Sequence, residues 1–400
     1  MSEWKKVKFL DVVSLNPRVS LEKGAVYPFV EMSNAVPGAR KPEKDVYQKY
    51  SGGGAKFEEG DTVVARIEPC LQNGKGFQCS YKKGFGSTEF LVFRPLNLKE
   101  MDCDYLYYYM GQQSIREAMA KTMVGASGRQ RVNNAVFNDL QINLPPLKIQ
   151  QEIASILSRY DSLIENYRKQ IKLLEEAAQR LYKEWFVELR FPGHENTKMV
   201  DGLPEGWKKG VLEDIASESG KKVDKKVRDN FKYYLPIDCL PKQSLTYLSP
   251  ADISLAESSL VSFAKGDILF GAMRPYFHKV CFAQSSGLTR STCFVLNAKD
   301  SDYQGFLLML LFDEGTIKHA TSISVGTTMP YTRWKEFKSM KILIPNKELA
   351  ITFGEIIEIV KNRLMRLASL IRLLTEARDR LLPRLMGGEM DVKNNIRERK

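Results

Sequence analysis

Residues 151–186 read QEIASILSRYDSLIENYRKQIKLLEEAAQRLYKEWF, and their apolar side chains recur at alternating spacings of four and three residues. A repeat of 3.5 residues kept over more than four heptads is typical of a coiled-coil seam, whereas a lone surface helix follows 3.6. Adding 200 to each position gives the same spacing in residues 353–385, with Arg378 as the one departure. The predicted seam residues are Ile153, Leu157, Tyr160, Ile164, Tyr167, Ile171, Leu174 and Leu181 in the first helix, and Phe353, Ile357, Val360, Leu364, Leu367, Ile371, Leu374 and Leu381 in the second.

The common register of the two helices predicts that they pair with each other. We expect an antiparallel pair within one chain, with the two globular parts related by a pseudo-twofold axis. About 40 residues at a rise of roughly 1.5 Å give a rod on the order of 60 Å. The alternative is an ordinary amphipathic helix in a bundle, which so long a stretch without a helix breaker disfavours.

The sequence before each helix is duplicated as well. The matches, in chain order, are Trp4-Lys5-Lys6 with Trp207-Lys208-Lys209, Gly60-Asp61 with Gly266-Asp267, Ser87-Thr88 with Ser291-Thr292, and residues 137–145 (FNDLQINLP) with residues 337–345 (FKSMKILIP). The order is kept while the offset drifts only between 200 and 206, which short loop insertions explain. One architectural unit, a globular domain followed by a long helix, is therefore used twice.

Each globular part has mixed secondary-structure signals. Short β-like runs bounded by Gly and Pro occupy residues 61–66, 90–93 and 267–270, and segments 102–121 and 302–319 look helical. These patterns predict an α/β, or mixed α+β, fold with a strongly curved sheet. The expected parts are a first globular domain (1–148), a first coiled-coil helix (149–190), a Pro/Gly-rich linker (191–206), a second globular domain (207–346), a second coiled-coil helix (347–388) ended by Pro383 and Gly387-Gly388, and a flexible tail (389–400).

The charge balance favours a polyanionic partner. Sixty Lys and Arg against 48 Asp and Glu give a formal net charge of +12, and each phosphate neutralised releases a condensed counterion. An anionic membrane is the other candidate, but the longest apolar run, Phe306–Phe312, is far short of the roughly 20 residues of a membrane span. No apolar segment follows Met1, and the six cysteines form no C-x-x-C pair. We therefore expect a cytoplasmic protein with free thiols.

Motifs for catalysis are missing from the sequence. Three scattered histidines, at 194, 278 and 319, make no ligand pair, and there is no G-x-x-x-x-G-K-[ST] loop. Residues 144–147 (LPPL) lack the polar entry residue and the aromatic of a methyltransferase base-gripping loop. Asp61 and Asp267 each follow a glycine and are interpreted as turn residues, and Ser51–Gly54 is interpreted as a flexible loop. We predict no catalytic residue, no metal and no cofactor.

The positive features are basic and polar side chains in Gly-rich loops. Residues 125–131 (GASGRQR) have residues 326–333 (GTTMPYTR) at the matching place. Arg pairs bidentately with guanine and Gln with adenine, as sequence readout requires. A second set follows the strand Val63–Ile67, with Arg66 taken as the equivalent of Arg274. The candidate DNA-binding residues are Arg66, Gln72, Asn73, Lys75, Ser127, Arg129, Gln130, Arg131, Arg274, Tyr276, His278, Lys279, Thr327, Thr328, Tyr331 and Arg333.

For any single member of this set the competing interpretation is a solvated surface charge. The set gains weight because it recurs at matching positions of the two copies. The framework residues are shared while the loops differ, and two copies of one scaffold with different loops would read two different short sequences. Basic pairs such as Arg40-Lys41, Lys82-Lys83 and Lys221-Lys222 are candidates for phosphate contacts.

Essentially the whole chain resembles the specificity subunit of Type I restriction–modification enzymes. The resemblance rests on residues 144–147 (LPPL) followed by 150–157 (QQEIASIL), and on 203–207 (LPEGW), 265–269 (KGDIL) and 381–389 (LLPRLMGGE), in this order. It implies two target recognition domains that read the halves of an asymmetric, interrupted DNA sequence, and two conserved helices that set the distance between them. It also implies assembly with two methyltransferase subunits, and with restriction subunits for cutting, so that catalysis belongs to those partners. Residues 345–348 (PNKE) depart from the Pro-Pro-x-x-Gln-Gln stretch of the first copy.

Two other classes compete with this interpretation. A bifunctional restriction enzyme or methyltransferase chain is disfavoured because its motifs are missing. A coiled-coil scaffold whose basic charge serves solubility has no need of duplicated domains with divergent loops. Apolar residues away from the seam, such as Leu163 and Leu370, are candidate surfaces for partner subunits.

Overall fold

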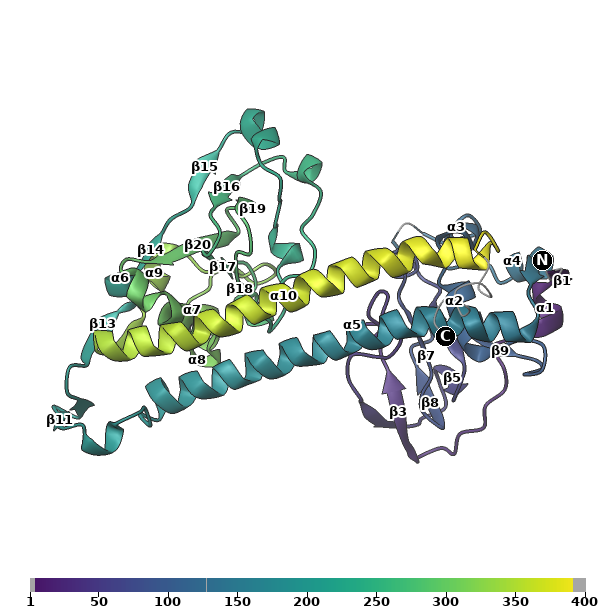
Figure 1. Ribbon diagram of the computed structural model, residues 1–400, viewed down its shortest axis with the longest axis horizontal. Coiled ribbons are helices and arrows are strands. Elements are labelled where there is room, and N and C mark those ends of the chain that lie inside the picture. Colours follow the sequence, from purple (N-terminus) through teal and green to yellow (C-terminus); the bar gives the residue numbers. More distant parts are fainter. Residues whose placement is uncertain (1–3, 127, 391–400) are drawn as a thin grey trace, which may run out of the picture. The chain divides into compact units, whose positions relative to one another are not determined.

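The two long helices are the longest elements of the chain. The computed structural model describes residues 4–126 and 128–390, and it contains α5 (Leu147–Tyr182) and α10 (Lys347–Met386) (Figure 1). The chain divides into two compact units: a first unit of residues 1–165 and 374–400, and a second unit of residues 166–373. Because both boundaries fall inside the long helices, each unit consists of one globular domain and a part of both helices.

The first unit is built on two four-stranded sheets. One has the order β2-β9-β6-β7 and is antiparallel throughout; the other has the order β4-β3-β8-β5, in which only β3 and β8 are parallel. A separate ribbon pairs β1 with β10. The strands are β1 (Lys5–Lys8), β2 (Val13–Leu15), β3 (Val26–Val30), β4 (Tyr47–Lys49), β5 (Ala55–Glu58), β6 (Thr62–Ala65), β7 (Gly76–Gln78), β8 (Lys83–Gly86), β9 (Phe90–Pro95) and β10 (Gln141–Leu144), and the short helices are α1 (Phe9–Val12), α2 (Cys103–Met110), α3 (Gln113–Ala120) and α4 (Val136–Asp139).

The second unit repeats this plan. Its antiparallel sheet β14-β20-β17-β18 corresponds to β2-β9-β6-β7, its ribbon β13-β21 corresponds to β1-β10, and a three-stranded sheet has the order β15-β16-β19. The strands are β11 (Met199–Val200), β12 (Leu203–Pro204), β13 (Lys208–Val211), β14 (Ala216–Glu218), β15 (Lys221–Val223), β16 (Leu260–Phe263), β17 (Ile268–Gly271), β18 (Val280–Phe282), β19 (Gly287–Arg290), β20 (Cys293–Ala298) and β21 (Lys341–Ile344). The helices are α6 (Leu212–Ile215), α7 (Gln304–Phe312), α8 (Glu314–Ser322) and α9 (Trp334–Phe337), with short turns η1 (Lys183–Val187, a π-helical turn), η2 (His194–Asn196), η3 (Lys225–Asn230), η4 (Ile237–Cys239), η5 (Ile253–Leu255), η6 (Pro275–Phe277) and η7 (Ser301–Tyr303).

These elements confirm the predicted mixed fold, with three differences in detail. The predicted helix 102–121 is two helices, α2 and α3, and the predicted helix 302–319 is divided into η7, α7 and α8. Local caps explain the second division, because the Asp313 carboxylate accepts a hydrogen bond from the Gly315 N–H at 2.7 Å and starts a new helix. Pro383 does not end α10, which continues to Met386; Gly387 and Gly388 follow it.

The halves of α5 and α10 pair in antiparallel orientation within each unit. In the first unit Leu157 packs in the same core cluster as Leu385, and in the second the rings of Trp185 and Phe353 lie 5.6 Å apart. The predicted seam side chains are all at least partly buried. Those of Ile153, Leu157, Ile164, Ile171, Phe353, Ile357, Leu364, Leu367 and Ile371 are buried, and those of Tyr160, Tyr167, Leu174, Leu181, Val360, Leu374 and Leu381 are half-buried.

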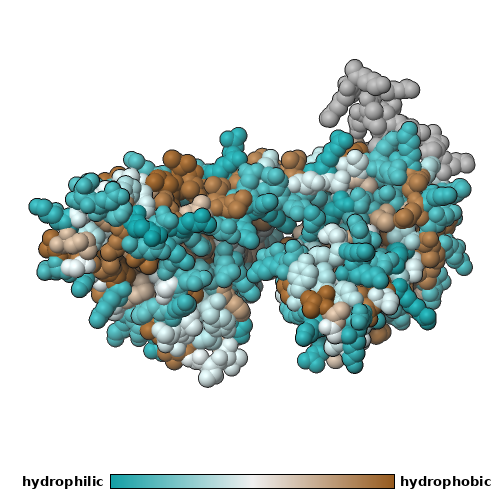
Figure 2. Space-filling model, turned by 90° about the horizontal axis from the view of Figure 1, so that it is seen from below, coloured by the Kyte–Doolittle hydropathy of each residue, from teal (hydrophilic) through white to brown (hydrophobic). Residues whose placement is uncertain are grey.

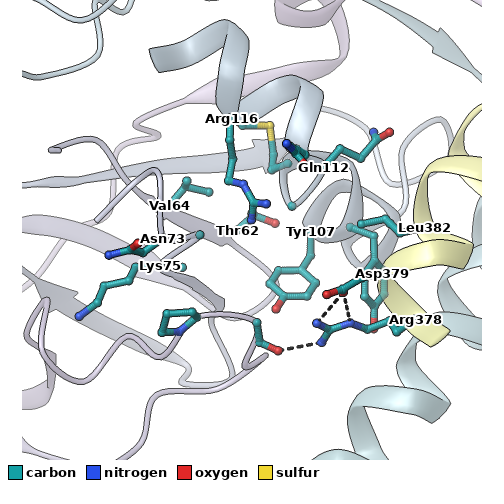
Figure 3. A pocket seen from close by; sticks show the side chains of 18 of the residues that line it. Thr62, Val64, Asn73, Lys75, Tyr107, Gln112, Arg116, Arg378, Asp379 and Leu382 are labelled. Carbon is teal, nitrogen blue, oxygen red and sulfur yellow. Dashed lines mark hydrogen bonds and ion pairs between the residues drawn. The ribbon is translucent and has the colours of Figure 1, made fainter. Parts of the chain in front are cut away.

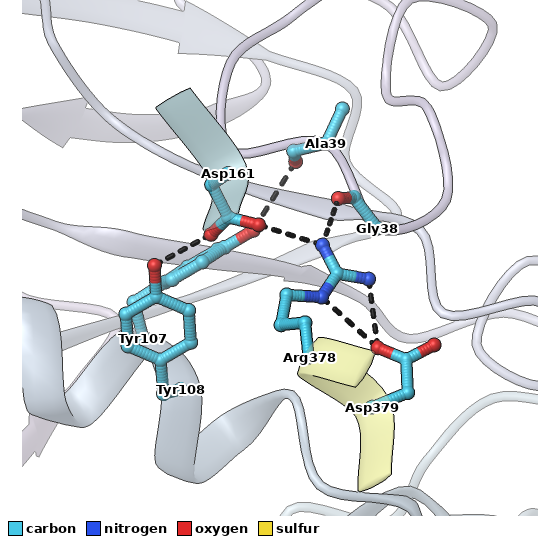
Figure 4. Close-up of polar contacts among 7 residues, drawn as sticks. All are labelled: Gly38, Ala39, Tyr107, Tyr108, Asp161, Arg378 and Asp379. Atoms are coloured by element: carbon cyan, nitrogen blue, oxygen red, sulfur yellow. Dashed lines mark hydrogen bonds and ion pairs between the residues drawn. The ribbon is translucent and has the colours of Figure 1, made fainter. Parts of the chain in front are cut away.

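Arg378, the departure from the apolar spacing, forms a buried polar cluster in the first unit (Figure 4). Its Nη1 donates to the Asp161 carboxylate on α5 at 2.7 Å and to the Gly38 carbonyl oxygen at 2.8 Å. The Tyr108 hydroxyl on α2 donates to the other Asp161 oxygen at 2.5 Å, and Asp379 accepts two further bonds from Arg378. Burial opposes the charge of the guanidinium, but the two carboxylates outweigh it and raise the pKa of Arg378. The cluster therefore ties the globular domain to both helices.

The second unit has a different polar tie between α5 and its globular domain. The buried Glu175 carboxylate on α5 accepts hydrogen bonds from the Ser244 hydroxyl at 2.7 Å and from the Leu245 N–H at 2.8 Å. Burial raises the pKa of Glu175 to about 7, although these hydrogen bonds act in the opposite direction. Arg378 thus anchors the globular domain of the first unit, whereas the Glu175 carboxylate anchors the equivalent domain of the second unit.

Figure 2 shows hydrophilic residues over most of the face it presents, with hydrophobic residues in separate patches. None of the helices in the described part of the chain is long and apolar enough to span a bilayer.

Candidate nucleic-acid interface

A small hairpin at the end of β6 carries the predicted reading loop of the first unit. Val124 and Arg131 exchange two backbone hydrogen bonds of 3.0 Å, and Arg131 also forms a β-bridge with Ile67. Gly125 turns the chain at φ +125°, in a region that residues with a Cβ rarely adopt. The hairpin is therefore fastened to the sheet at its base, where Arg131 pairs with Ile67.

The second unit contains the same hairpin. Val325 and Tyr331 exchange two backbone hydrogen bonds of 3.0 Å, and Tyr331 forms a β-bridge with Met273. Gly326 adopts φ +108°, like its counterpart Gly125.

The hydrogen bonds around the two hairpins correct the predicted correspondence of two arginines. Val132 N–H donates to Arg66 O at 2.9 Å where Thr332 N–H donates to Ala272 O at 2.9 Å. Likewise, Glu68 N–H donates to Gln130 O at 3.0 Å where Arg274 N–H donates to Pro330 O at 2.7 Å. Arg66 is thus equivalent to Ala272, and Arg274 is equivalent to Glu68. The prediction that paired Arg66 with Arg274 is wrong by two residues, because it matched residue type and not the offset of 206 set by the preceding Gly-Asp.

The tips of the two hairpins present different side chains. In the first unit Arg129 is exposed and Gln130 half-buried, while Ser127 lies outside the described residues. In the second unit Thr327 and Thr328 are exposed. The two tips therefore offer different hydrogen-bonding groups on one backbone framework.

The last residue of each hairpin is engaged at its base. The Arg131 guanidinium binds the Glu89 carboxylate through Nε at 2.8 Å and Nη2 at 2.6 Å, and this contact lowers the pKa of Glu89. At the equivalent place the Tyr331 hydroxyl donates to the Ser291 carbonyl oxygen at 3.2 Å. A charged brace in the first unit thus corresponds to a neutral one in the second.

Several other predicted residues lie around these hairpins. Arg66 Nη2 donates to Val132 O at 3.2 Å, and Arg274 Nη2 donates to Thr328 O at 3.1 Å. Gln72 is exposed and bonds Glu68 at 2.8 Å. Two more are exposed in the second unit, namely Tyr276 and Arg333.

Two predicted residues of the first unit lie at a different site. Asn73 and Lys75 line a cavity of about 560 Å³ between β6, the α2–α3 turn and α10 (Figure 3). The Lys75 ammonium donates to the Met32 carbonyl oxygen at 2.9 Å. In Figure 3 both side chains extend away from α10, and the described residues that line this cavity include none of the hairpin.

Two predicted residues of the second unit are structural. His278 is 5% exposed, and its Nε2 donates to the Phe312 carbonyl oxygen at 2.9 Å. Burial lowers the pKa of His278 and that of Lys279, whose ammonium donates to Ile237 O at 2.6 Å. A base edge cannot reach a side chain enclosed like His278, so this part of the prediction was wrong for physical reasons: the sequence shows residue type but not burial.

The carboxylates at the start of β6 and β17 serve the fold. Asp61 is buried and binds Arg94 at 2.6 and 2.8 Å, and it also accepts the Glu58 N–H. Asp267 accepts the Ala264 N–H at 2.8 Å. Both close the turn before the strand, as the sequence suggested. Among residues 4–126 and 128–390, no group of three His, Cys, Asp or Glu side chains is placed to hold a metal ion.

Comparison with known proteins identifies this duplicated architecture. The family model described as type I restriction modification DNA specificity domain matches residues 1–176 and again residues 204–369. Two Methanocaldococcus jannaschii proteins, the type I restriction enzyme MjaVIII and MjaIX specificity subunits, are each 27% identical; the alignments cover 78% and 72% of this chain and 76% and 69% of theirs. The crystal structure of a type I restriction-modification S subunit from M. genitalium shares the fold, with a TM-score of 0.56, 16% identity and 96% of both chains covered. The chain therefore belongs to the family of type I restriction–modification DNA specificity subunits, which supply recognition and not catalysis, and it carries two specificity domains in tandem.

Proposed function

We propose that residues 1–148 and 207–346 are two target recognition domains, each reading one half of an asymmetric, interrupted DNA sequence. One observation carries the proposal: the same hairpin is fastened to the same sheet in both units by equivalent hydrogen bonds, but its tip differs. A conserved backbone with divergent tips is what two readers of different sequence require.

The chemistry of each tip fits readout of base edges. Arg129 and Gln130 supply the donors and acceptors that recognise guanine and adenine in the major groove. Thr327 and Thr328 supply hydroxyl groups and methyl surface, which suit several base edges and the thymine methyl. The first half-site is therefore proposed to contain a purine read by Arg129.

The helices are proposed to hold the two domains apart at the distance that the target requires. They are long and continuous, with 36 residues in α5 and 40 in α10. One heptad added to both helices lengthens the pair by about 10 Å, and we expect the preferred spacer to grow by about three base pairs. Selection of bound sequences from a pool with variable spacers measures this; an unchanged spacer would show that the helices do not set it.

Two methyltransferase subunits, and restriction subunits in the full complex, are the proposed protein partners, and the cytoplasm is the proposed location. Catalysis and cofactors would belong to these partners. Apolar residues on the outer face of the helices support docking there: Leu163 is 45% exposed, Ile359 71% and Leu373 57%. Leu370 is half-buried and is a weaker candidate than the sequence suggested. Leu163→Glu and Ile359→Glu should lower co-purification with a methyltransferase subunit; full recovery would place docking elsewhere.

The reading role is tested with Arg129→Ala in the complex with methyltransferase subunits. Binding is measured on duplexes that carry every single-base change of the target. We expect a loss of about 1–3 kcal/mol on the target and relaxed preference at one position of the first half-site only. Lys121→Ala, an exposed lysine at the end of α3, is the matched control and should leave base preference unchanged. Uniform weakening on all duplexes would mean that Arg129 contacts phosphate and reads no base.

A further inference from the structure

The first unit contains a second concave surface, next to the hairpin and separate from its tip. This groove has a volume of about 660 Å³ and lies where the two sheets of the domain meet. One wall is the loop of residues 16–20 after β2, and the other is the start of β5 with Gly54 before it. Phe90 and Val92 of β9 form the floor, and Arg66 closes the end nearest the hairpin.

Backbone contacts fix both walls of the groove. Asn16 adopts φ +50°, and its backbone N–H and side-chain oxygen bond the O and N–H of Val92 at 2.7 and 3.0 Å. Gly54 adopts φ +85°, and a Cβ there would lie 2.3 Å from the Gly86 carbonyl oxygen. Only glycine allows this close approach. Gly54, the last residue of the segment interpreted from sequence as a flexible loop, therefore has a fixed position in the wall of the groove.

The groove is lined by cations without counter-charges. Arg18, Lys56 and Arg66 line it, and no carboxylate does so within the described residues. The structure gives neither Arg18 nor Lys56 an ion pair in the described part of the chain; Lys56 lies 5.3 Å from the centre of the Tyr50 ring. Arg66 makes one side-chain hydrogen bond, to Val132 O, and its buried Nε has no partner among the described residues. Unpaired cations at a concave surface attract an anion.

Two neighbouring groups do not cancel this charge. Lys83 adds to it, since its ammonium donates to the carbonyl oxygen of Ser20 in the wall at 3.3 Å. Glu89 lies close to Arg66, but its carboxylate is held by Arg131 through the paired contact at the hairpin base. The groove therefore keeps a net positive charge.

We propose that this groove binds DNA backbone phosphates, an inference that rests on the proposed reading function. Arg66 connects the groove to the hairpin. Its carbonyl oxygen accepts the Val132 N–H at 2.9 Å, and its N–H donates to Glu89 O at 2.9 Å. A phosphate held at Arg66 is thus in fixed register with the hairpin, and such contacts position a protein on DNA without specifying sequence.

The groove distinguishes the two domains. The positions that correspond to Arg18, Lys56 and Arg66 are Lys221, Ser262 and Ala272, so the second domain keeps one cation of the three. The first domain therefore supplies more of the sequence-independent affinity, and the second depends more on its tip.

The test uses the full chain in complex with methyltransferase subunits and measures binding to a target duplex and an unrelated duplex over a salt series. Each of Arg18→Ala and Lys56→Ala should flatten the slope of log K against log salt by about 0.9. Between roughly 50 and 200 mM salt this is about a three- to fourfold smaller loss of affinity per variant. Both duplexes should respond equally, because phosphate contacts carry no sequence information. Lys99→Ala, an exposed lysine of the same domain outside the groove, should leave the slope unchanged.

The outcomes separate this proposal from the reading function. Wild-type slopes in both groove variants would overturn the groove and leave reading intact. A change of base preference without a change of slope would also overturn it. If the wild-type complex binds both duplexes equally, reading fails, and the slopes still decide whether the groove binds phosphate.

Discussion

Removal of the Asp161 carboxylate should destabilise the first unit more than removal of an exposed ion pair would. In Asp161→Asn the Arg378 guanidinium stays buried but loses its 2.7 Å partner on α5, and the Tyr108 hydroxyl loses a charged acceptor. Breaking one side of a buried pair costs about 3–5 kcal/mol. Asp379 and the Gly38 carbonyl oxygen still accept from Arg378, which puts the expected loss near the lower limit, about 3 kcal/mol.

Hydrogen–deuterium exchange by mass spectrometry measures this loss locally. A loss of about 3 kcal/mol corresponds to about a hundredfold faster exchange through local opening. We expect that increase in peptides covering α2 and the last turns of α10, with peptides of residues 216–298 unchanged. Glu165→Gln is the control: Glu165 pairs with Lys41 at 3.4 Å, both side chains are more than half exposed, and the expected effect is below about 1 kcal/mol.

The double variant Asp161→Asn, Arg378→Met tests the reasoning itself. It removes both charges and restores an apolar seam position, so it should recover most of the lost protection. If Asp161→Asn behaves like Glu165→Gln, the buried cluster does not anchor the domain, and the argument from burial is refuted.

Three further outcomes are expected. The second unit should lose stability as the pH rises from about 4.5 to 7, because the folded state raises the pKa of Glu175 to about 7 and so holds its proton more tightly than the unfolded chain. Glu175→Gln should remove this loss, which is at most about 3 kcal/mol, from thermal melts across that pH range. Parallel wild-type and variant curves would exclude Glu175 as the cause. Glu89→Gln should weaken the contact that holds Arg131 at the base of the first hairpin, and so weaken base preference at the first half-site only. Selection of bound sequences measures this preference. Equal effects on both half-sites would contradict a role confined to this hairpin. Leu364→Ala in the buried seam should cost about 2–5 kcal/mol of unfolding free energy in urea, while Leu373→Ala, which is 57% exposed, should stay within about 0.5 kcal/mol; similar losses would contradict the seam.

The long helices were predictable because period is a local property of sequence. Even their one exception, Arg378, was visible as a break in the spacing. Its partners were not: Asp161 lies one position off the seam, and Tyr108 reaches the cluster from 53 residues away. Nothing in a sequence pattern of one helix indicates which polar group of another element will meet it.

The two hairpins were partly predictable, because glycines and polar residues mark an exposed loop. The groove was not, since Arg18 comes from the loop after β2 and Lys56 from strand β5, and only the tertiary structure brings them together. The prediction for His278 was wrong because its side chain is buried against Phe312, a contact that the sequence does not show. Residue type indicates what a side chain can do, and only the tertiary structure decides whether it is accessible.

The division of the long helices between the two units has a consequence for synthesis. Residues 166–373 form the second unit as one continuous stretch, whereas the core of the first unit includes Leu385 and Met386, more than 200 residues after its last strand. During translation the second unit has all of its chain before the first does. The domain that leaves the ribosome first must wait, with part of its apolar face open, until the C-terminal turns of α10 emerge. The domain made first is thus the last to be completed.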